Sequence, residues 1–192
     1  MGRWEPGARE RLVVAAADLF ADQGYDETTV AQIAERAGVT KSTFFRQFPD
    51  KREVLVAGQA VMSDLLAEGI AEAPAEATPL DAVRAGLERA SSALGPANRA
   101  LGPRIAVAVA ASDELQARDA LKSVGLAAAM TEALEARGVP APTAHLAGEL
   151  GVLAFKRGFA AWVEATDDPD GDLGPYALTA LEELRAASLS LS

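Results

Sequence analysis

The sequence predicts an all-α protein in which three short helices at the N-terminus precede a larger helical domain. Good helix formers such as Ala, Leu, Glu and Arg dominate its 192 residues. Apolar residues recur at helical spacing, and the alternating pattern of strands is absent. Glycine and proline separate the apolar segments where helices are expected to end. Hydrophobic residues make up 49% of the chain, which is enough to bury a sizeable core.

Apolar spacing and helix-end signals define the individual elements. Gly24 and Gly38 are natural helix stops, Pro49 breaks a helix, and Asp50 can cap the helix that follows it. We read the Gly102-Pro103 pair as a further break. The predicted helices span residues 8–23, 30–37, 40–48, 51–73, 79–94, 103–111, 112–137, 142–166 and 175–189.

Composition excludes several functional classes. The chain has no cysteine and a single histidine, His145, so disulfide frameworks and thiolate or multi-histidine metal sites are excluded. The acidic segment 167–172 lacks the spacing of an EF-hand and predicts a solvated loop. The N-terminus lacks the apolar region of a signal peptide, and charges interrupt each long apolar stretch, so we expect no membrane span. The sequence therefore predicts a cytoplasmic protein without metal or cofactor, and no catalytic constellation indicates an enzyme.

Positive charge is concentrated in one short segment of an acidic chain. The net charge is -10, from 28 acidic and 18 basic residues. Residues 36–52, in contrast, hold five basic residues against one acidic residue. Because the Debye length is about 10 Å in 0.1 M salt, distant acidic residues are largely screened from an anion that contacts this segment. Local charge should therefore outweigh net charge here.

The same segment has the pattern of a helix-turn-helix. Ala34 is small enough for two helices to cross closely, and Gly38 can adopt the left-handed conformation that the turn needs. Val39 and Phe44 then face inward, with Ile33, Phe20 and Phe48 completing a small core. This leaves short polar and cationic residues on or near the outer face of the third helix, where they can reach base edges or phosphates: Thr40, Lys41, Ser42, Thr43, Arg46 and Gln47. Spacing alone also allows a structural helical hairpin with a solvated basic face.

Residues 8–55 resemble the N-terminal domain of the TetR/AcrR family of transcriptional regulators. The resemblance rests on AAADLFADQGYDETTVAQIAERAGVTKSTFFRQFPDKREVL, which contains the family's G-Y-x-x-T-T, I-A-x-x-A-G-V and F-x-x-K elements. It implies a DNA-binding domain over residues 1–50 and a ligand-binding and dimerisation domain over residues 51–192. Phe45 departs from the family's usual tyrosine, and Gln47 from its frequent histidine.

The resemblance also implies roles for individual residues. Phosphate contacts are expected from Thr28 or Thr29, from Lys51 and from the start of the fourth helix. Arg3, Arg9 and Arg11 either add phosphate contacts from an N-terminal arm or belong to a solvated tail. The full set of expected DNA-binding residues is Thr28, Thr29, Thr40, Lys41, Ser42, Thr43, Phe45, Arg46, Gln47 and Lys51.

The second domain is expected to dimerise and to bind a small molecule. Glycines 148, 151 and 158 suggest close approach of another helix, and we expect a homodimer through helices 142–166 and 175–189. An apolar pocket is conceivable between the helices, with Arg104 holding an anionic group. Two alternatives stay open: an aromatic stripe such as Phe155 and Phe159 is more often plain core, and an arginine such as Arg104 more often forms a surface ion pair. The candidate pocket residues are Met62, Leu66, Arg104, Ile105, Val109, Met130, Phe155 and Phe159.

We therefore expect a ligand-responsive regulator that binds a double-stranded DNA operator, most simply a repressor released by an apolar effector. The fourth helix is the expected lever, because it begins beside the DNA reader and ends in the ligand domain. Two other readings are a helical small-molecule binding protein whose hairpin is structural, and a cofactor-free helical enzyme, for which the sequence offers no positive feature.

Overall fold

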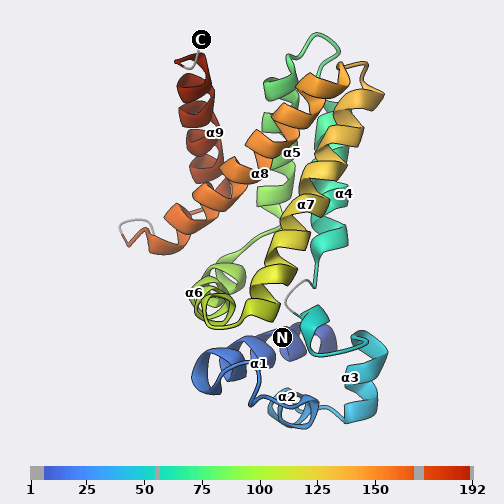
Figure 1. The fold of residues 1–192 in the computed structure, drawn as a ribbon, viewed down its shortest axis with the longest axis vertical. Helices are drawn as coiled ribbons and strands as arrows, with labels where there is room; N and C mark the ends of the chain where they lie inside the picture. The colour runs from blue at the N-terminus through green and yellow to red at the C-terminus, as the bar shows by residue number, and fades with distance from the viewer. Residues whose placement is uncertain (1–6, 55–56, 167–170, 191–192) are drawn as a thin grey trace, which may run out of the picture. The chain divides into compact units, whose positions relative to one another are not determined.

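The computed structural model describes residues 7–54, 57–166 and 171–190, and these residues form only helices, turns and loops (Figure 1). The all-α prediction is confirmed. Arg3 of the expected arm and most of the acidic segment 167–172 lie outside the described residues. The α-helices are α1 (Ala8–Gln23), α2 (Val30–Arg36), α3 (Lys41–Gln47), α4 (Gln59–Glu72), α5 (Pro79–Ser92), α6 (Pro96–Ala110), α7 (Asp113–Ala136), α8 (Ala141–Glu164) and α9 (Leu173–Leu189).

Two compact units make up the chain. The first contains residues 1–57 together with residues 101–120, and the second contains residues 58–100 and 121–192. Helices α6 and α7 therefore each contribute residues to both units. Nothing in the sequence pattern indicates that residues 101–120 belong with the N-terminal helices.

The core of the first unit is built as the apolar spacing predicts. Leu12, Ala16 and Phe20 of α1 are buried at 0–1% exposure, as are Ile33 of α2 and Phe44 of α3. The segment 101–120 adds Ala108 and Leu115, both 1% exposed, to the same cluster. This core fixes α3 against α1 and leaves the other face of α3 free of core contacts.

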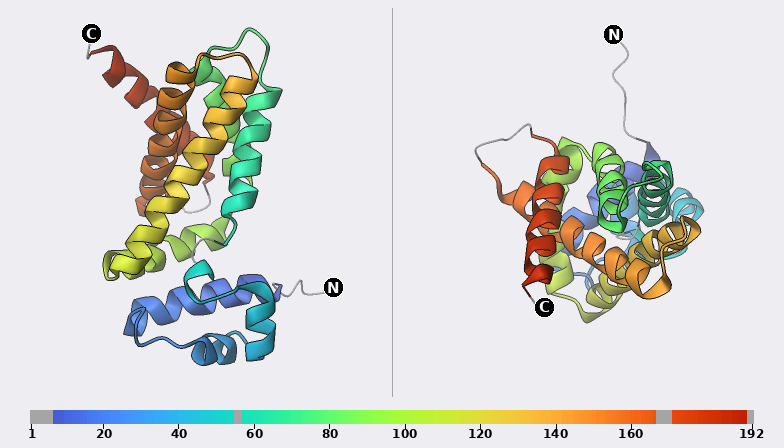
Figure 2. Two further views of the ribbon diagram at one scale, coloured as in Figure 1. Left: turned by 45° about the vertical axis from the view of Figure 1, so that its right-hand side comes forward. Right: turned by 90° about the horizontal axis from the view of Figure 1, so that it is seen from above.

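The second unit is a bundle of α4, α5, α7 and α8 with α9 packed on α8 (Figure 2). Helices α4 and α5 approach closely at Gly69, where a Cβ atom would lie only 2.6 Å from the carbonyl oxygen of Ala85. Leu66 and Met130 are completely buried in its core. At the C-terminal end of α4, the Arg137 guanidinium donates hydrogen bonds to the carbonyls of Ile70 and Ala73 at 3.1 and 2.8 Å.

Two predicted helix boundaries were wrong. The fourth helix begins at Gln59 rather than Lys51, because Asp50 caps only a short 3-10 helix, Arg52–Val54, and Gly58 adopts a left-handed φ of 91°. Helix α6 continues through Pro103, which lacks the N–H of one helical hydrogen bond but does not end the helix. Local end signals do not reveal whether surrounding contacts compensate for such a lost bond.

The glycines of α8 are explained by contacts within the chain. A Cβ atom on Gly148 would lie 2.7 Å from the Thr131 hydroxyl oxygen, and one on Gly158 would lie 2.4 Å from Cα of Ala177. Their small size therefore serves the packing of α8 against α7 and α9, and it is no argument for a second chain.

One segment satisfies a composition criterion for crossing a membrane. Residues 52–72 have a mean hydropathy of 1.4 over the most apolar window. The core helix of a soluble protein meets the same criterion, and α4 buries Leu66 and Ile70 completely.

Candidate DNA-binding interface

The turn between α2 and α3 has the geometry that the sequence predicts. Gly38 has a φ of 67°, and a chain reversal follows in which the amide of Val39 donates to the carbonyl of Ala34 at 2.9 Å. Ala34 is 2% exposed. A residue with a Cβ atom would be strained at position 38, so glycine is what lets α3 fold back against α2.

Threonine side chains cap both short helices. The Thr29 hydroxyl accepts a hydrogen bond from the amide of Gln32 at 3.3 Å, and the Gln32 side chain accepts one from the Thr29 amide at 2.8 Å. The Thr40 hydroxyl accepts from the amide of Thr43 at 3.1 Å. Each cap satisfies an otherwise unpaired amide at a helix start and is worth about 1 kcal/mol. The caps therefore fix where α2 and α3 begin.

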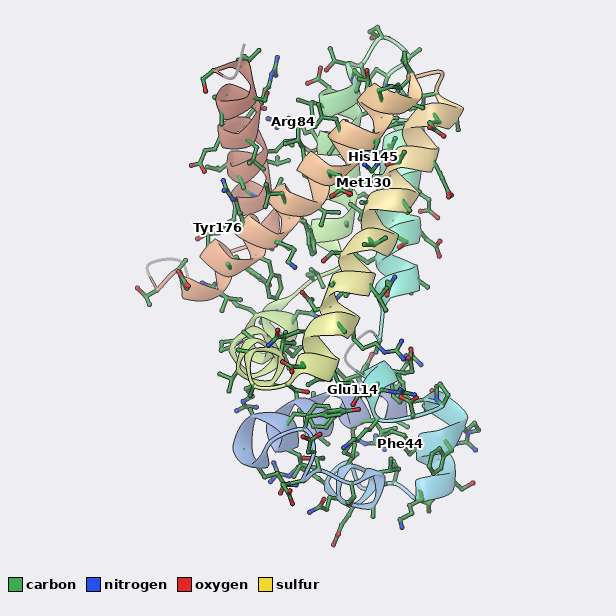
Figure 3. The ribbon with its side chains drawn as sticks, in the orientation of Figure 1. Phe44, Arg84, Glu114, Met130, His145 and Tyr176 are labelled. Carbon is green, nitrogen blue, oxygen red and sulfur yellow. The ribbon has the colours of Figure 1, made fainter. Side chains whose placement is uncertain are left out.

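The outer face of α3 is polar and basic, with one large aromatic ring. Phe44 points from α3 into the first unit and is fully buried (Figure 3). Phe45, the next residue, is 56% exposed. The remaining predicted residues of this helix are either exposed (Thr40, Lys41, Ser42 and Arg46) or half-buried (Thr43 and Gln47). This face can meet a polar, anionic partner while Phe44 holds the helix in place.

Two of the residues expected to contact phosphates make hydrogen bonds inside the protein. Thr28 is 1% exposed, and its hydroxyl donates to the carbonyl of Gly24 at 2.7 Å. The Lys51 ammonium donates to the carbonyls of Tyr25 and Thr28 at 2.7 and 3.0 Å and lies 4.0 Å from the centre of the Tyr25 ring. The structure thus gathers Thr28, Thr29 and Lys51 at the start of α2.

Two arginines that the sequence assigned to an arm or a solvated tail instead contact the ends of α2 and α3. Both lie on α1. The Arg9 guanidinium stacks 4.5 Å from the centre of the Phe48 ring and donates to the carbonyl of Gln47 at 3.0 Å. Arg11 donates to the carbonyl of Ala37 at 3.1 Å. These bonds tie α1 to the C-terminal ends of α2 and α3, and only the positions of those ends in space reveal them.

Most of the basic residues of segment 36–52 are already paired. Arg36 lies 3.5 Å from Asp22, and Arg52 lies 2.5 Å from Asp50. The hydrogen bond from Arg52 lowers the pKa of Asp50, and that bond likewise raises the pKa of Arg52. Within the described part of the chain, Lys41 and Arg46 have no acidic partner at ion-pairing distance. The positive charge available to a phosphate is therefore smaller than the sequence suggests, and it lies on α3.

The candidate pocket residues are divided between the two units. Leu66 and Met130 are buried in the core of the second unit, with Met62 and Phe155 packed against it and Phe159 in an adjoining aromatic cluster.

The other three candidates belong to the first unit. Arg104 forms an ion pair with Asp18, Val109 packs against the N-terminal core, and Ile105 is half-buried.

None of the eight candidates lines either of two surface hollows in the described part of the second unit. One, of about 420 Å³, lies between α4 and α5 and is lined by Gly69, Ala85 and Arg89 among others. The other, of about 340 Å³, lies between α8 and α9 and is lined by Arg157, Tyr176 and neighbouring residues.

A tightly turned helix pair with a polar, cationic and exposed second helix defines a helix-turn-helix protein of the DNA-binding class. Comparison with known proteins makes this assignment more specific. Residues 12–57 match the family model described as bacterial regulatory proteins, tetR family. Residues 12–57 therefore form a TetR-family helix-turn-helix domain, as the resemblance implied, and the relatives that match this part of the chain are transcriptional regulators.

Curated relatives match this N-terminal part. The regulator TcmR of Streptomyces glaucescens is 39% identical over 75 residues, which cover 39% of this chain and 33% of TcmR. The transcriptional activator FasR of Mycolicibacterium smegmatis is 35% identical over 65 residues, which cover 34% of this chain and 30% of FasR. The matched region thus spans about a third of each relative.

Solved structures match over most of the chain. FadR of Thermus thermophilus, a TetR-family transcriptional repressor solved in complex with lauroyl-CoA, is 25% identical, with 91% of both chains covered and a TM-score of 0.54. FadR of Bacillus halodurans, a fatty acid degradation regulator, is 17% identical with a TM-score of 0.53, and 94% of this chain and 95% of that one are covered, which supports the fold alone.

Proposed function

We propose that the protein binds an operator in double-stranded DNA through α3 and releases it when a small apolar effector binds the helical domain. The observation that carries the DNA-binding part is the outer face of α3, where the cations of Lys41 and Arg46 lack acidic partners among the described residues beside an exposed Phe45. Cations of this kind contact phosphates, and neighbouring hydroxyl and amide groups read base edges.

Specific binding by one α3 helix is weak, and a homodimer solves this by reading two half-sites about 34–36 Å apart or a multiple of that distance. We propose that α8 and α9 form the dimer interface. In support, α8 exposes Leu146 and Leu153, at 60% and 41%, as apolar residues without a core contact. Burial of such residues favours association by about 25 cal/mol per Å² of apolar area.

The dimer interface is tested by Leu146→Glu and Leu153→Glu in sedimentation velocity. We expect monomers, because each substitution would place a charge inside the interface. Val61→Glu is the matched control, since Val61 on α4 is also 61% exposed. Dimers that persist in both leucine variants would refute this interface.

For the effector, we propose an apolar chain that enters the core of the second unit near Leu66 and Met130. Both side chains are completely buried, so entry requires the helices to separate. The ligand then favours a second conformation, and it releases DNA only if it binds that conformation more tightly. The lauroyl-CoA complex of the Thermus thermophilus FadR supports an acyl chain as the ligand class.

Release by an acyl chain is tested by titrating the DNA complex with lauroyl-CoA and, as control, free coenzyme A. We expect only the acylated molecule to dissociate the complex. Met130→Trp should weaken this response, because a larger side chain fills the space that the ligand needs. Identical responses to both molecules would refute an apolar effector. We further propose that the protein represses transcription. A reporter gene placed downstream of the bound duplex tests this, because its expression should rise when the protein is removed.

DNA binding itself is tested with duplexes that the wild-type protein selects from a random pool. We expect Arg46→Ala to weaken binding at least fivefold, because an uncommitted cation is lost. Arg36→Ala is the matched control, since Arg36 is paired with Asp22. A protein that enriches no duplex from the pool would refute the proposed function.

A further inference from the structure

One large apolar side chain lies on the outer face of α3. The residue is Phe45, which is 56% exposed. Its neighbours on this face are the polar and cationic side chains of Lys41, Ser42 and Arg46, all of them exposed. Single apolar residues are common on protein surfaces, so exposure alone assigns no role to Phe45. The way in which its ring is held carries the argument further.

A buried aromatic cluster supports the Phe45 ring. The centres of the Phe45 and Phe44 rings lie 5.5 Å apart, and the planes meet at 82°, which is the favourable edge-to-face arrangement. Phe44 is completely buried (Figure 3), and its ring centre lies 5.8 Å from that of Phe48, which is 2% exposed. The Arg9 guanidinium in turn stacks 4.5 Å from the centre of the Phe48 ring. The core thus fixes one side of the Phe45 ring, while more than half of the residue stays accessible.

A fixed apolar ring between cations fits one feature of the major groove of DNA. Phosphates line the edges of the groove, where cations such as Lys41 and Arg46 can contact them. Every base pair presents hydrogen-bond donors and acceptors in the floor of the groove, and thymine alone adds an apolar group, its 5-methyl. The Phe45 ring has no side-chain donor or acceptor with which to pair the polar base edges. The thymine methyl is therefore the complementary group.

We propose that Phe45 determines part of the operator sequence by contacting the 5-methyl group of a thymine in the major groove. This inference rests on the proposed DNA-binding function. A polar base edge against the ring would lose its water without gaining a hydrogen bond, so the ring selects thymine against the other bases at this position. Because Phe44 already holds the ring, Phe45 loses little conformational freedom when it binds.

Deoxyuridine in place of thymidine tests the contact, because the exchange removes the 5-methyl group and leaves the base pair otherwise unchanged. The duplexes are those that the wild-type protein selects from a random pool, with one thymidine exchanged at a time. We expect a thymine in each half-site at which the exchange weakens binding about fourfold, the effect of one buried methyl group. Selected duplexes that share no thymine, or wild-type affinity that no exchange changes, would overturn the proposal.

A double-mutant cycle between protein and DNA assigns the methyl group to Phe45. Phe45→Ala should bind the thymidine and deoxyuridine duplexes equally to within about 1.5-fold, whereas Phe45→Leu, which keeps an apolar surface, should retain about a twofold preference. Val14→Ala is the matched control, because Val14 on α1 is also an exposed apolar residue, at 39%, and this variant should keep the full preference. A preference for thymidine that persists in Phe45→Ala would come from duplex stiffness or another residue and would overturn the assignment. Circular dichroism at the assay temperature restricts the comparison to folded variants.

The salt dependence of binding separates a base contact from a phosphate contact. Phe45→Ala should weaken binding without changing the slope of log affinity against log salt, because the substitution removes no cation. Arg46→Ala should reduce that slope by about 1 for each protomer, as loss of a phosphate contact does. A slope that changes in Phe45→Ala as it does in Arg46→Ala would overturn the base contact. If the wild-type protein selects no duplex at all, the proposed function fails first, which is distinguishable from selected duplexes whose thymine methyl groups make no difference.

Discussion

A methyl group added at Gly158 tests the packing of α8 against α9. Its Cβ atom would lie 2.4 Å from Cα and 2.5 Å from the amide nitrogen of Ala177. These are backbone atoms that cannot rotate away, and the distances fall about 1 Å short of ordinary contact, so α9 would have to move. Overpacking of this kind costs about 1–3 kcal/mol. Alanine recovers about 1 kcal/mol of helix propensity. Because two backbone atoms clash, we place the overpacking cost in the upper part of its range, where it exceeds the gain in helix propensity. We therefore expect Gly158→Ala to lower the free energy of unfolding by about 1–2 kcal/mol.

Thermal and urea denaturation followed by circular dichroism measure this effect. For a chain of this length, 1 kcal/mol corresponds to about 2–4 °C in Tm. Gly174→Ala is the matched control on α9, because the nearest atom to its Cβ, in the side chain of Ser91, is 4.0 Å away. That variant should be as stable as the wild type or more so. A Gly158→Ala protein that gains stability like the control would refute the close approach of α8 and α9.

Three further predictions concern the DNA-binding unit. Phe45→Tyr adds a hydroxyl to a ring that is 56% exposed, and it should tighten binding of a labelled duplex about fivefold if the hydroxyl donates to a phosphate, whereas unchanged affinity would place the ring away from the backbone. Asp50→Asn tests the carboxylate whose pKa Arg52 lowers below the ordinary value of 3.8. The folded state therefore prefers the charged form of Asp50. The stabilisation from this charge is present above pH 3.8 and is lost as the pH falls through the lower folded-state pKa. Urea midpoints of the variant should therefore be lower at pH 7 and should fall less than the wild type's in acid. Lys41 and Arg46 are the main available cations of each N-terminal unit, so a dimer should show a slope of about -4 when the logarithm of its DNA affinity is plotted against the logarithm of salt concentration. A slope near -9 would mean that the paired cations also leave their partners to bind phosphates.

The helix-turn-helix was predictable because its determinants are local. Ala34, Gly38 and Phe44 lie within eleven residues and act on one another through a single turn. The first helix ends at Gln23, in agreement with the stop signal of Gly24, for the same reason. Sequence patterns of this length report short-range sterics and hydrogen bonding, and these forces decide the geometry of small helical elements.

The remainder of the site was not predictable because it depends on residues far apart in the chain. Lys51 finds its partners at Tyr25 and Thr28, more than twenty residues earlier. Leu115 completes the N-terminal core from a helix whose own pattern gives no hint of that role. A basic residue at the expected start of a helix indicates phosphate binding when only its neighbours are considered. The same residue can instead stabilise a turn once a carbonyl pair and an aromatic face lie within reach.

The pairing of most basic residues has a consequence for the proposed binding of an operator. Non-specific attraction to DNA grows with the number of phosphates that a protein neutralises. Each N-terminal unit offers few cations that are free to contact phosphates, and the chain as a whole carries a net charge of -10. Weak general attraction must then be compensated by short-range contacts from the hydroxyl, amide and aromatic groups of α3. Such contacts require α3 to be held accurately, and the bonds from Arg9, Arg11 and Lys51 to the ends of α2 and α3 provide that accuracy. Under the proposed function, most cations of the first unit thus contribute to recognition by fixing its geometry, and only a minority contribute by direct attraction.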